Sequence, residues 1–424
     1  MRSRLLLFVI ILVTLLTGSD SSVYGQRNSG DVEGDFLPSS VIVEGVALGK
    51  KKDFAAARQK FETALGYWQV HHSGALFLKI LDDVNARTLE KKTAVNIFKA
   101  VQEDFNTKHK KAVKRFNKVI KKNKTYFPVY LLKGEALANL EEQDDAEAAY
   151  AEAIALAGNA ALPYLFRGKF HARNDDREQA IADFSKAIQV DGASAISLFE
   201  RGFAYCLARE YSDAIHDFEA AIKQYPDWEK STVVNEAFHN RGIQRLEKKS
   251  YRGAVKDFDR AIKINPEFLN SYFSRGLAYR RLNKYSTALV DFTTCIDKKA
   301  DFTDAYYQRA LTHFKRKHYQ KSVKDLKQAL AREPGNKQFR YKLGESYYKL
   351  GHYTKAVAQF DKVIRQDRSM FWAYYWKGYS LAYLGKSKQA IAAFQQFLSR
   401  VPKKHRGQIF YAETEIEKLK RGSR

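Results

Sequence analysis

A glycine or alanine recurs in this chain at a spacing of 34 residues. These marker positions are Gly134, Gly168, Gly202, Gly242, Gly276, Ala310, Gly344 and Gly378, and only the step from Gly202 to Gly242 is longer, by six residues. Each marker is followed by a small residue after twelve positions and by an aromatic residue or leucine after sixteen, as Gly202 is by Ala214 and Phe218. A period of this length is typical of stacked supersecondary units.

Each unit contains two stretches whose apolar residues have helical spacing, for example 195–208 and 211–225. The sequence therefore predicts an all-α chain in which each unit is a pair of antiparallel helices. Prolines stand at unit ends, where they stop a helix without breaking one. Gly202 and Ala214 are equally far from Ala208, so they are predicted to lie at one level and let the two helices approach closely.

The pattern resembles the tetratricopeptide repeat, in its small-residue pair, its later aromatic residue, an Ala-Ile such as Ala221-Ile222 and a closing proline. Eight clear copies cover residues 127–404. The resemblance implies a right-handed superhelical solenoid of stacked helix pairs. It also implies that the first helix of each pair lines a concave face on which ligands lie.

Weaker copies precede the clear array. Residues 38–126 are predicted to hold divergent repeats, with an extra helix at about 72–92. After the array, residues 405–424 are predicted to form a capping helix and a basic tail, with Phe410, Ile416 and Leu419 facing inward, because an open stack needs a polar cap.

The chain begins with the features of a secretory signal peptide. Arg2 and Arg4 precede an apolar run from Leu5 to Leu16, and a cleavage site follows Gly25. Residues 1–25 are therefore predicted to be a signal peptide, with retention as a membrane anchor as the alternative, and 26–37 a polar linker. Export would place the chain in a bacterial periplasm or cell envelope, or in the endoplasmic reticulum lumen or outside the cell of a eukaryote.

Five repeats carry an arginine directly before the marker and an aspartate directly before the later aromatic residue or leucine. The pairs are Arg167 with Asp183, Arg201 with Asp217, Arg241 with Asp257, Arg275 with Asp291, and Arg309 with Asp325. Neither residue occurs without the other in the clear copies, and the first degenerate copy reverses the signs, with Glu44 and Lys60. This predicts an ion pair across each hairpin; the alternative is a row of arginines that bind phosphate.

By the resemblance, one stripe of the first helices faces the concave groove. Its predicted peptide-binding residues are Phe199, Phe203, Phe273, Tyr307, Phe314, Tyr341, Tyr348, Trp372, Tyr375, Tyr379 and Tyr383. Arg280, Lys315 and Lys349 are interleaved with them. Aromatic anchors beside basic residues suit an extended protein or peptide segment. Packing between neighbouring repeats is the alternative role for these rings.

The formal net charge is +25, which favours anionic partners. The most basic stretch, 108–124, contains the predicted anionic-surface residues Lys108, Lys110, Lys111, Lys114, Arg115, Lys118, Lys121 and Lys122. They form either a solvated outer face or a patch for an anionic envelope polymer or a lipid surface. Nucleic acid suits an exported protein less well. Electrostatic binding through these basic faces is the alternative function.

No motif for catalysis, phosphate binding or metal binding occurs in the sequence. Cys206 and Cys295 are interpreted as small buried core residues, and the adjacent pair His71-His72 lacks neighbours at ligand spacing. We therefore expect no cofactor, no metal and no small-molecule substrate. The sequence predicts a non-enzymatic scaffold or adaptor that binds a protein or peptide partner of unknown identity.

Overall fold

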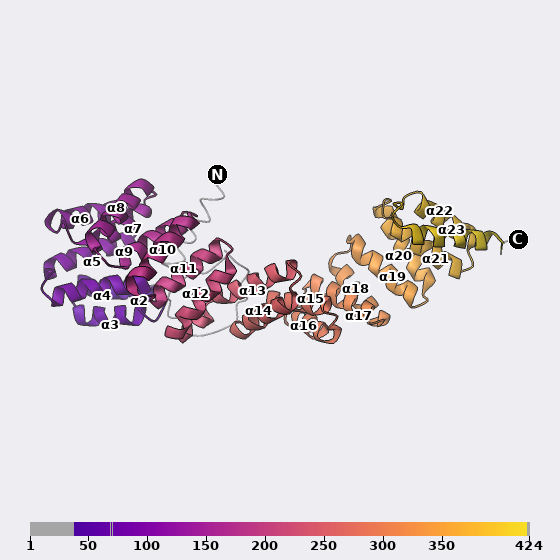
Figure 1. The fold of residues 1–424 in the computed structure, drawn as a ribbon, viewed down its shortest axis with the longest axis horizontal. Coiled ribbons are helices and arrows are strands. Elements are labelled where there is room, and N and C mark those ends of the chain that lie inside the picture. The colour runs from indigo at the N-terminus through magenta and orange to yellow at the C-terminus, as the bar shows by residue number, and fades with distance from the viewer. Residues whose placement is uncertain (1–37, 68, 70, 422–424) are drawn as a thin grey trace. The chain divides into compact units, whose positions relative to one another are not determined.

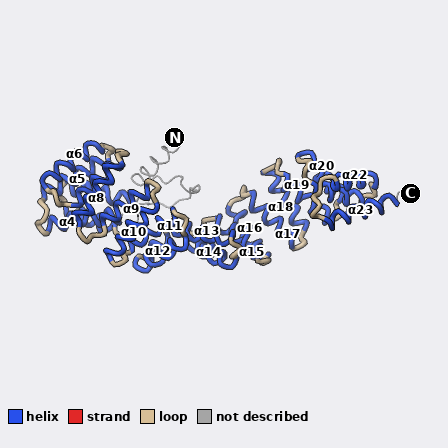
Figure 2. Tube along the Cα trace, turned by 45° about the horizontal axis from the view of Figure 1, so that its top comes forward, coloured by secondary structure: helices blue, strands red, loops and turns tan. Residues whose placement is uncertain are grey.

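The computed structural model describes residues 38–421, except 68 and 70. Within these residues the chain forms 22 α-helices and one short 3-10 helix, and it contains no strand (Figures 1 and 2). The predicted all-α fold of stacked helix pairs is confirmed. The predicted signal peptide, 1–25, and the linker, 26–37, lie outside the described residues. None of the described helices combines the length and the apolar character required to cross a bilayer.

The chain divides into two units, residues 1–237 and 238–424, with the boundary inside α13 (Thr232–Glu247). Unit 1 contains α2 (Pro38–Lys50), α3 (Phe54–Ala64), α4 (His71–Asn85), α5 (Lys91–Phe105), α6 (His109–Lys122), α7 (Phe127–Ala138), α8 (Gln143–Ala157), α9 (Leu162–Arg173), α10 (Arg177–Asp191), α11 (Ala195–Leu207), α12 (Tyr211–Gln224) and the 3-10 helix η1 (Pro226–Lys230). Unit 2 contains α14 (Tyr251–Ile264), α15 (Leu269–Arg281), α16 (Tyr285–Lys298), α17 (Thr303–Lys315), α18 (Tyr319–Arg332), α19 (Lys337–Lys349), α20 (Tyr353–Gln366), α21 (Phe371–Tyr383), α22 (Ser387–Leu398) and α23 (Arg406–Arg421).

The marker glycines explain how closely the two helices of a hairpin approach. A Cβ added to Gly202 would lie 2.7 Å from the Phe218 ring and 3.1 Å from the Ala214 carbonyl oxygen, so no larger side chain fits without movement. The turn of this hairpin passes through Arg209, whose φ is 63°. In two later hairpins the left-handed turn residue is a glycine, Gly351 or Gly385, which adopts positive φ without strain.

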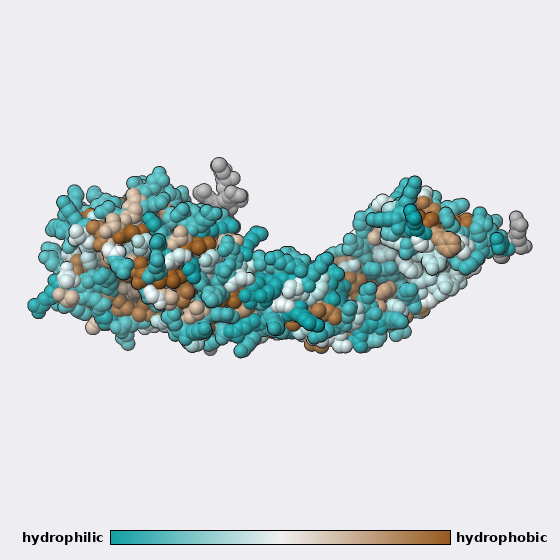
Figure 3. All heavy atoms as spheres, in the orientation of Figure 1, coloured by the Kyte–Doolittle hydropathy of each residue, from teal (hydrophilic) through white to brown (hydrophobic). Residues whose placement is uncertain are grey.

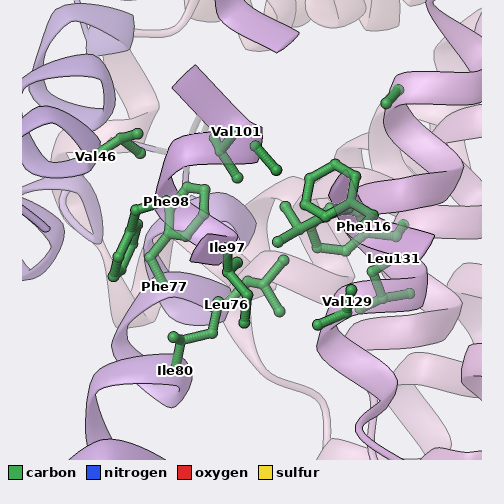
Figure 4. Packing of buried hydrophobic residues seen from close by; sticks show 14 of the residues in the cluster. Val46, Leu76, Phe77, Ile80, Ile97, Phe98, Val101, Phe116, Val129 and Leu131 are labelled. Atoms are coloured by element: carbon green, nitrogen blue, oxygen red, sulfur yellow. The ribbon is translucent and has the colours of Figure 1, made fainter. Parts of the chain in front are cut away.

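The N-terminal part of unit 1 departs from the regular stack. α2 and α3 form a hairpin, α4 follows alone, and both α2 and α4 contact α5. Figure 4 shows their side chains in one continuous core, where Val46 of α2 and Leu76, Phe77 and Ile80 of α4 meet Ile97 of α5 and residues of the helices that follow. The rings of Phe61 and Phe98 stack within this core, with centroids 6.0 Å apart.

The last helix, α23, packs on α22 with two of its three predicted inward residues, Ile416 and Leu419. Ala412 and Ile416 are buried and Leu419 packs against the same cluster, whereas Phe410 is 64% exposed. The predicted inward position of Phe410 is wrong. Successive helical residues are rotated by about 100°, so a residue two positions before Ala412 lies nearly on the opposite side of the helix.

The two cysteines are free thiols. Cys295 is buried as predicted, but Cys206 is only partly buried by its exposed area. Burial raises the pKa of both thiols to about 12. Both therefore stay protonated at neutral pH, and neither has the lowered pKa of a reactive cysteine.

Candidate functional site

The repeated arginines belong to the scaffold. Arg201 donates from Nε to Asp217 Oδ2 at 2.7 Å and from Nη2 to Asp217 Oδ1 at 2.9 Å. The same two-point contact joins Arg167 to Asp183, Arg241 to Asp257, Arg275 to Asp291 and Arg309 to Asp325. In the degenerate first repeat, Lys60 Nζ lies 2.6 Å from Glu44 Oε2. The predicted ion pairs are confirmed, and these arginines are not available as a row of phosphate-binding groups.

The predicted groove residues of unit 1 are only partly accessible. Phe199 on α11 is fully buried, and its ring lies 4.7 Å from that of Phe218 and 5.3 Å from that of Trp228. It cannot contact a ligand in this structure because neighbouring rings cover it. Phe203, one turn later on the same helix, is partly exposed.

α4 lies on two of the first helices of unit 1. This helix contacts α5 and α9, and the ring of His72 on α4 packs 5.0 Å from that of Phe166 on α9. Nearer its C-terminus, α4 presents Asp83, whose Oδ2 accepts a 2.8 Å hydrogen bond from the Tyr126 hydroxyl just before α7. A segment of the chain itself thus lies on the face that the family resemblance assigns to ligands.

The start of α4 contacts η1, which lies near the C-terminal end of unit 1 in the sequence. Trp228 Nε1 donates to the Gly66 carbonyl oxygen at 3.0 Å, and the His71 ring packs 5.8 Å from the Trp228 ring and 6.0 Å from that of Tyr225. Burial lowers the pKa of His71 to about 4. His71 therefore stays neutral when α4 is docked at neutral pH.

A cavity of about 140 Å³ remains beside α4, lined by residues of α2, α5, α7 and α9. Its charged side chains have partners within the protein. Arg173 Nη1 donates to Glu135 Oε2 at 3.0 Å, and Lys169 Nζ lies 3.1 Å from Glu200 Oε1. Small-molecule sites usually have volumes of roughly 300 Å³ or more. The cavity is therefore suited to ordered water rather than to a substrate.

In unit 2 the remaining predicted residues all lie on first helices. Phe273 is on α15, Tyr307 and Phe314 on α17, Tyr341 and Tyr348 on α19, and Trp372, Tyr375, Tyr379 and Tyr383 on α21. Ring contacts join consecutive repeats. Tyr307 packs 4.5 Å from Phe339 of α19, and Tyr348 packs 4.9 Å from Trp376 of α21.

Several of these rings serve packing at the C-terminal end of unit 2. Tyr375 is only 8% exposed and lies 4.9 Å from Phe397 of α22, while Tyr379 lies 5.0 Å from Phe394. Trp372 packs 5.1 Å from His405. These three residues hold α21 against the end of the stack, which was the alternative role of the stripe.

A second group of rings reaches the surface, and we call it the aromatic platform: Tyr348, Tyr353, Trp376 and Tyr383. Tyr383 is exposed and the other three are partly exposed. Tyr383 is 62% exposed and stacks on Tyr353, with centroids 4.6 Å apart and planes within 6° of each other. The Tyr348 ring lies 6.0 Å from that of Tyr383. Lys349, which is exposed, extends over this group, with Nζ 5.4 Å from the Trp376 ring. In Figure 3 the surface of the C-terminal helices of unit 2 combines hydrophobic residues, in brown, with residues of intermediate hydropathy, in pale colours.

The sequence did not assign Trp376 and Tyr353 to this surface. Tyr353 begins a second helix, and its stacking partner is the exposed ring of Tyr383 on the next first helix. The repeat pattern identifies positions that are equivalent in all copies. This contact depends on Tyr383, and no other clear copy has a tyrosine at the equivalent position. The signal available in the sequence was the local density of aromatic residues in 371–383.

The predicted anionic-surface residues lie on or next to α6. Arg115 is held by Glu103, with Nε 3.0 Å from Oε2, and Lys111 Nζ lies 3.4 Å from Glu103 Oε1. The other six, Lys108, Lys110, Lys114, Lys118, Lys121 and Lys122, are exposed. Such an arrangement is that of a solvated outer face, and binding of an anionic polymer or surface stays a prediction. Within the described residues, no cluster of three or more His, Cys, Asp or Glu side chains could hold a metal ion.

Sequence models of the tetratricopeptide repeat match residues 127–159, 167–227, 307–370 and 372–404. A search of curated proteins found no match. The matched segments contain most of the marker glycines and ring contacts described above.

Solved structures similar to this chain include tetratricopeptide repeat proteins. MamA from Desulfovibrio magneticus RS-1 is 18% identical, over 39% of this chain and 93% of that one, with a TM-score of 0.38. YrrB, described as a TPR protein with an unusual peptide-binding site, is 20% identical over 44% and 93%, with a TM-score of 0.36. The C-terminal part of a TPR repeat-containing protein from Cytophaga hutchinsonii is 18% identical over 58% and 99%, with a TM-score of 0.45. From the family matches and the repeat geometry, we conclude that this chain belongs to the tetratricopeptide repeat family.

Proposed function

We propose that this chain is a non-enzymatic scaffold that binds a segment of another protein on the first helices of unit 2. The observation that carries the proposal is the aromatic platform, where Tyr383 is 62% exposed and stacks on a second tyrosine beside a tryptophan. Aromatic residues of this kind supply much of the binding energy in protein interfaces. The absence of a catalytic motif from the sequence supports a binding role.

The chemistry of the platform favours a polypeptide. Flat rings offer apolar contact area, and the tyrosine hydroxyls and the indole N–H offer hydrogen bonds to backbone carbonyls. Lys349 adds a positive charge over the rings of Tyr348 and Trp376. An extended segment that follows the stack can contact successive repeats.

Unit 1 offers internal support for this binding mode. There the first helices already hold a polypeptide segment, α4, through ring packing at Phe166 and a hydroxyl–carboxylate hydrogen bond at Tyr126. The equivalent helices of unit 2 carry a denser set of aromatic residues. We infer that a partner segment makes contacts of the same kinds there.

The test is selection of peptides by the full chain from a phage-displayed library of random dodecapeptides. For a selected peptide, Tyr383→Ala is expected to raise the dissociation constant at least tenfold, which corresponds to about 1.4 kcal/mol. Tyr411→Ala is the matched control, because Tyr411 is 59% exposed but lies on the terminal helix α23. Failure to select any peptide, or equal losses in the two variants, would contradict the proposal.

We also propose that the chain is exported to a bacterial envelope. The support is the signal-peptide pattern in residues 1–25 alone. Fractionation of cells that express a C-terminally tagged chain should find it outside the cytoplasm, and N-terminal sequencing should begin at Gln26. An unprocessed chain in the cytoplasmic fraction would contradict export.

A further inference from the structure

Arg280 on α15 differs from the arginines that directly precede the markers in unit 2. Arg241, Arg275 and Arg309 each bind a buried aspartate at two points. Arg280 is partly buried, and its buried Nε has no hydrogen-bond partner. Within the described part of the chain, no carboxylate forms an ion pair with it.

The position of Arg280 in the repeat makes this unusual. It stands four residues after its marker, and the equivalent residues in the other clear copies are Ala138, Ala172, Cys206, Leu246, Phe314, Tyr348 and Ala382. All seven are uncharged, and one of them, Tyr348, belongs to the aromatic platform. A charged side chain has therefore replaced an uncharged one on the face where we propose that the partner lies.

Its surroundings compensate only in part for the lost hydration, because Tyr307 and Tyr285 favour the charged form but do not outweigh burial. The groups that influence Arg280 are Arg281, Tyr307 and Tyr285, and burial, followed by the like charge of Arg281, lowers the pKa of its guanidinium. A partly buried cation without a counter-ion lowers the stability of a fold. Such a loss of stability is typical of a functional group whose counter-ion is supplied by a bound ligand.

We propose that Arg280 binds the carboxylate of an aspartate or glutamate in the segment that docks on unit 2; this inference rests on the proposed function. A guanidinium presents its N–H groups as a planar fork that fits the two oxygens of a carboxylate. Removal of water on binding strengthens the attraction. Lys315 and Lys349, both exposed on the next two first helices, favour an acidic segment in the same direction.

The repeat geometry sets the spacing expected in the partner. Arg280 and the platform residue Tyr348 occupy equivalent positions two repeats apart. With neighbouring packed helices roughly 10 Å apart, the two contacts are separated by about 20 Å. An extended chain covers this distance in about six residues. The bound segment should therefore carry an acidic residue about six positions from an aromatic or aliphatic one.

The experiment repeats the dodecapeptide selection with three full-length proteins: wild type, Arg280→Gln and Arg281→Gln. Arg281→Gln is the matched control, because it removes the same charge from an adjacent, exposed side chain. Peptides selected by wild type and by Arg281→Gln should be enriched in Asp and Glu. Peptides selected by Arg280→Gln should lose that enrichment.

A selected peptide and its Asp→Asn or Glu→Gln analogue then complete a double-mutant cycle. Wild type should bind the acidic peptide at least tenfold more tightly than the amide, and Arg280→Gln should bind the two within about twofold, where tenfold corresponds to about 1.4 kcal/mol. An acid preference that survives in Arg280→Gln, or that Arg281→Gln also abolishes, would overturn the proposal while leaving peptide binding intact. If wild type selects no peptide, both the proposed function and this inference fail.

A stability measurement separates a binding role from a scaffold role. Arg280→Gln should have a Tm equal to or above that of wild type, because it removes a partly buried charge that lacks a partner. A clear fall in Tm would assign Arg280 to the scaffold and overturn the proposal.

Discussion

At the scale of single residues, the marker glycines are required by ring contacts within each hairpin. A Cβ added to Gly276 would lie 2.7 Å from the Phe292 ring, which is fully buried. The chain also contains the combination of alanine and leucine at the same two positions, as Ala310 and Leu326. Whether a marker tolerates a methyl group thus depends on the side chain opposite it.

We expect Gly276→Ala to destabilise the protein by about 1–3 kcal/mol, because it overpacks this contact. Adding Phe292→Leu should make the double variant less destabilised than the sum of the single variants. Urea unfolding of all four proteins measures this coupling. Simple additivity would show that the ring does not limit the space at Gly276.

The ion pair of Arg201 and Asp217 allows a second test at this scale. Asp217 is 1% exposed, so Asp217→Arg should destabilise by about 3 kcal/mol by leaving two cations together. Adding Arg201→Asp should restore part of the loss. The control is Asp213→Arg on the exposed side of the same helix, which should have little effect on the midpoint of thermal unfolding. If the second change restores nothing, the pair does not connect the two helices.

At the scale of elements, the docking of α4 is expected to depend on pH through His71. Burial lowers its pKa to about 4 in the folded protein, whereas an unfolded histidine has a pKa near 6.5. At pH values between these two pKa values, His71 is therefore protonated in the unfolded chain and neutral in the folded protein. The contribution of His71 to stability is complete above about pH 6.5 and is lost as the pH falls towards about 4.

We predict that the free energy of unfolding of wild type, relative to His71→Gln, falls by roughly 1 kcal/mol for each pH unit between 6 and 5. His216→Gln is the control, because His216 is exposed on α12. Denaturant unfolding at several pH values supplies the comparison. A wild-type and a His71→Gln profile that stay parallel would show that His71 is not buried against Trp228.

Contacts that repeat were predictable from the sequence, and the contacts of helices that occur once were not. The Arg–Asp pairs recur at a constant distance from the turn, so five copies inside one chain defined them. α4 has no repeat partner, and its position over α5 and α9 depends on how the stack curves, which no residue spacing encodes. Phe410 was misplaced because a single helix without a repeat offers two similar choices of inward stripe.

At the scale of the whole molecule, the two units use the same kind of helix face differently. In unit 1 the chain's own helix α4 lies on the first helices and buries Leu76, Phe77 and Ile80 there. In unit 2 the first helices present the aromatic platform and Arg280. The periodicity predicted which helices carry the stripe, but exposure had to come from the structure, since Tyr375 and Tyr383 belong to one stripe and differ greatly in burial.

The most direct test of this account is a hydrogen-exchange footprint of the full chain with a selected peptide bound. The account predicts slower exchange in α15, α17, α19 and α21, and no change in α5 and α9, on which α4 already lies. Protection confined to the helices of unit 1, or to the second helices of the repeats, would contradict it.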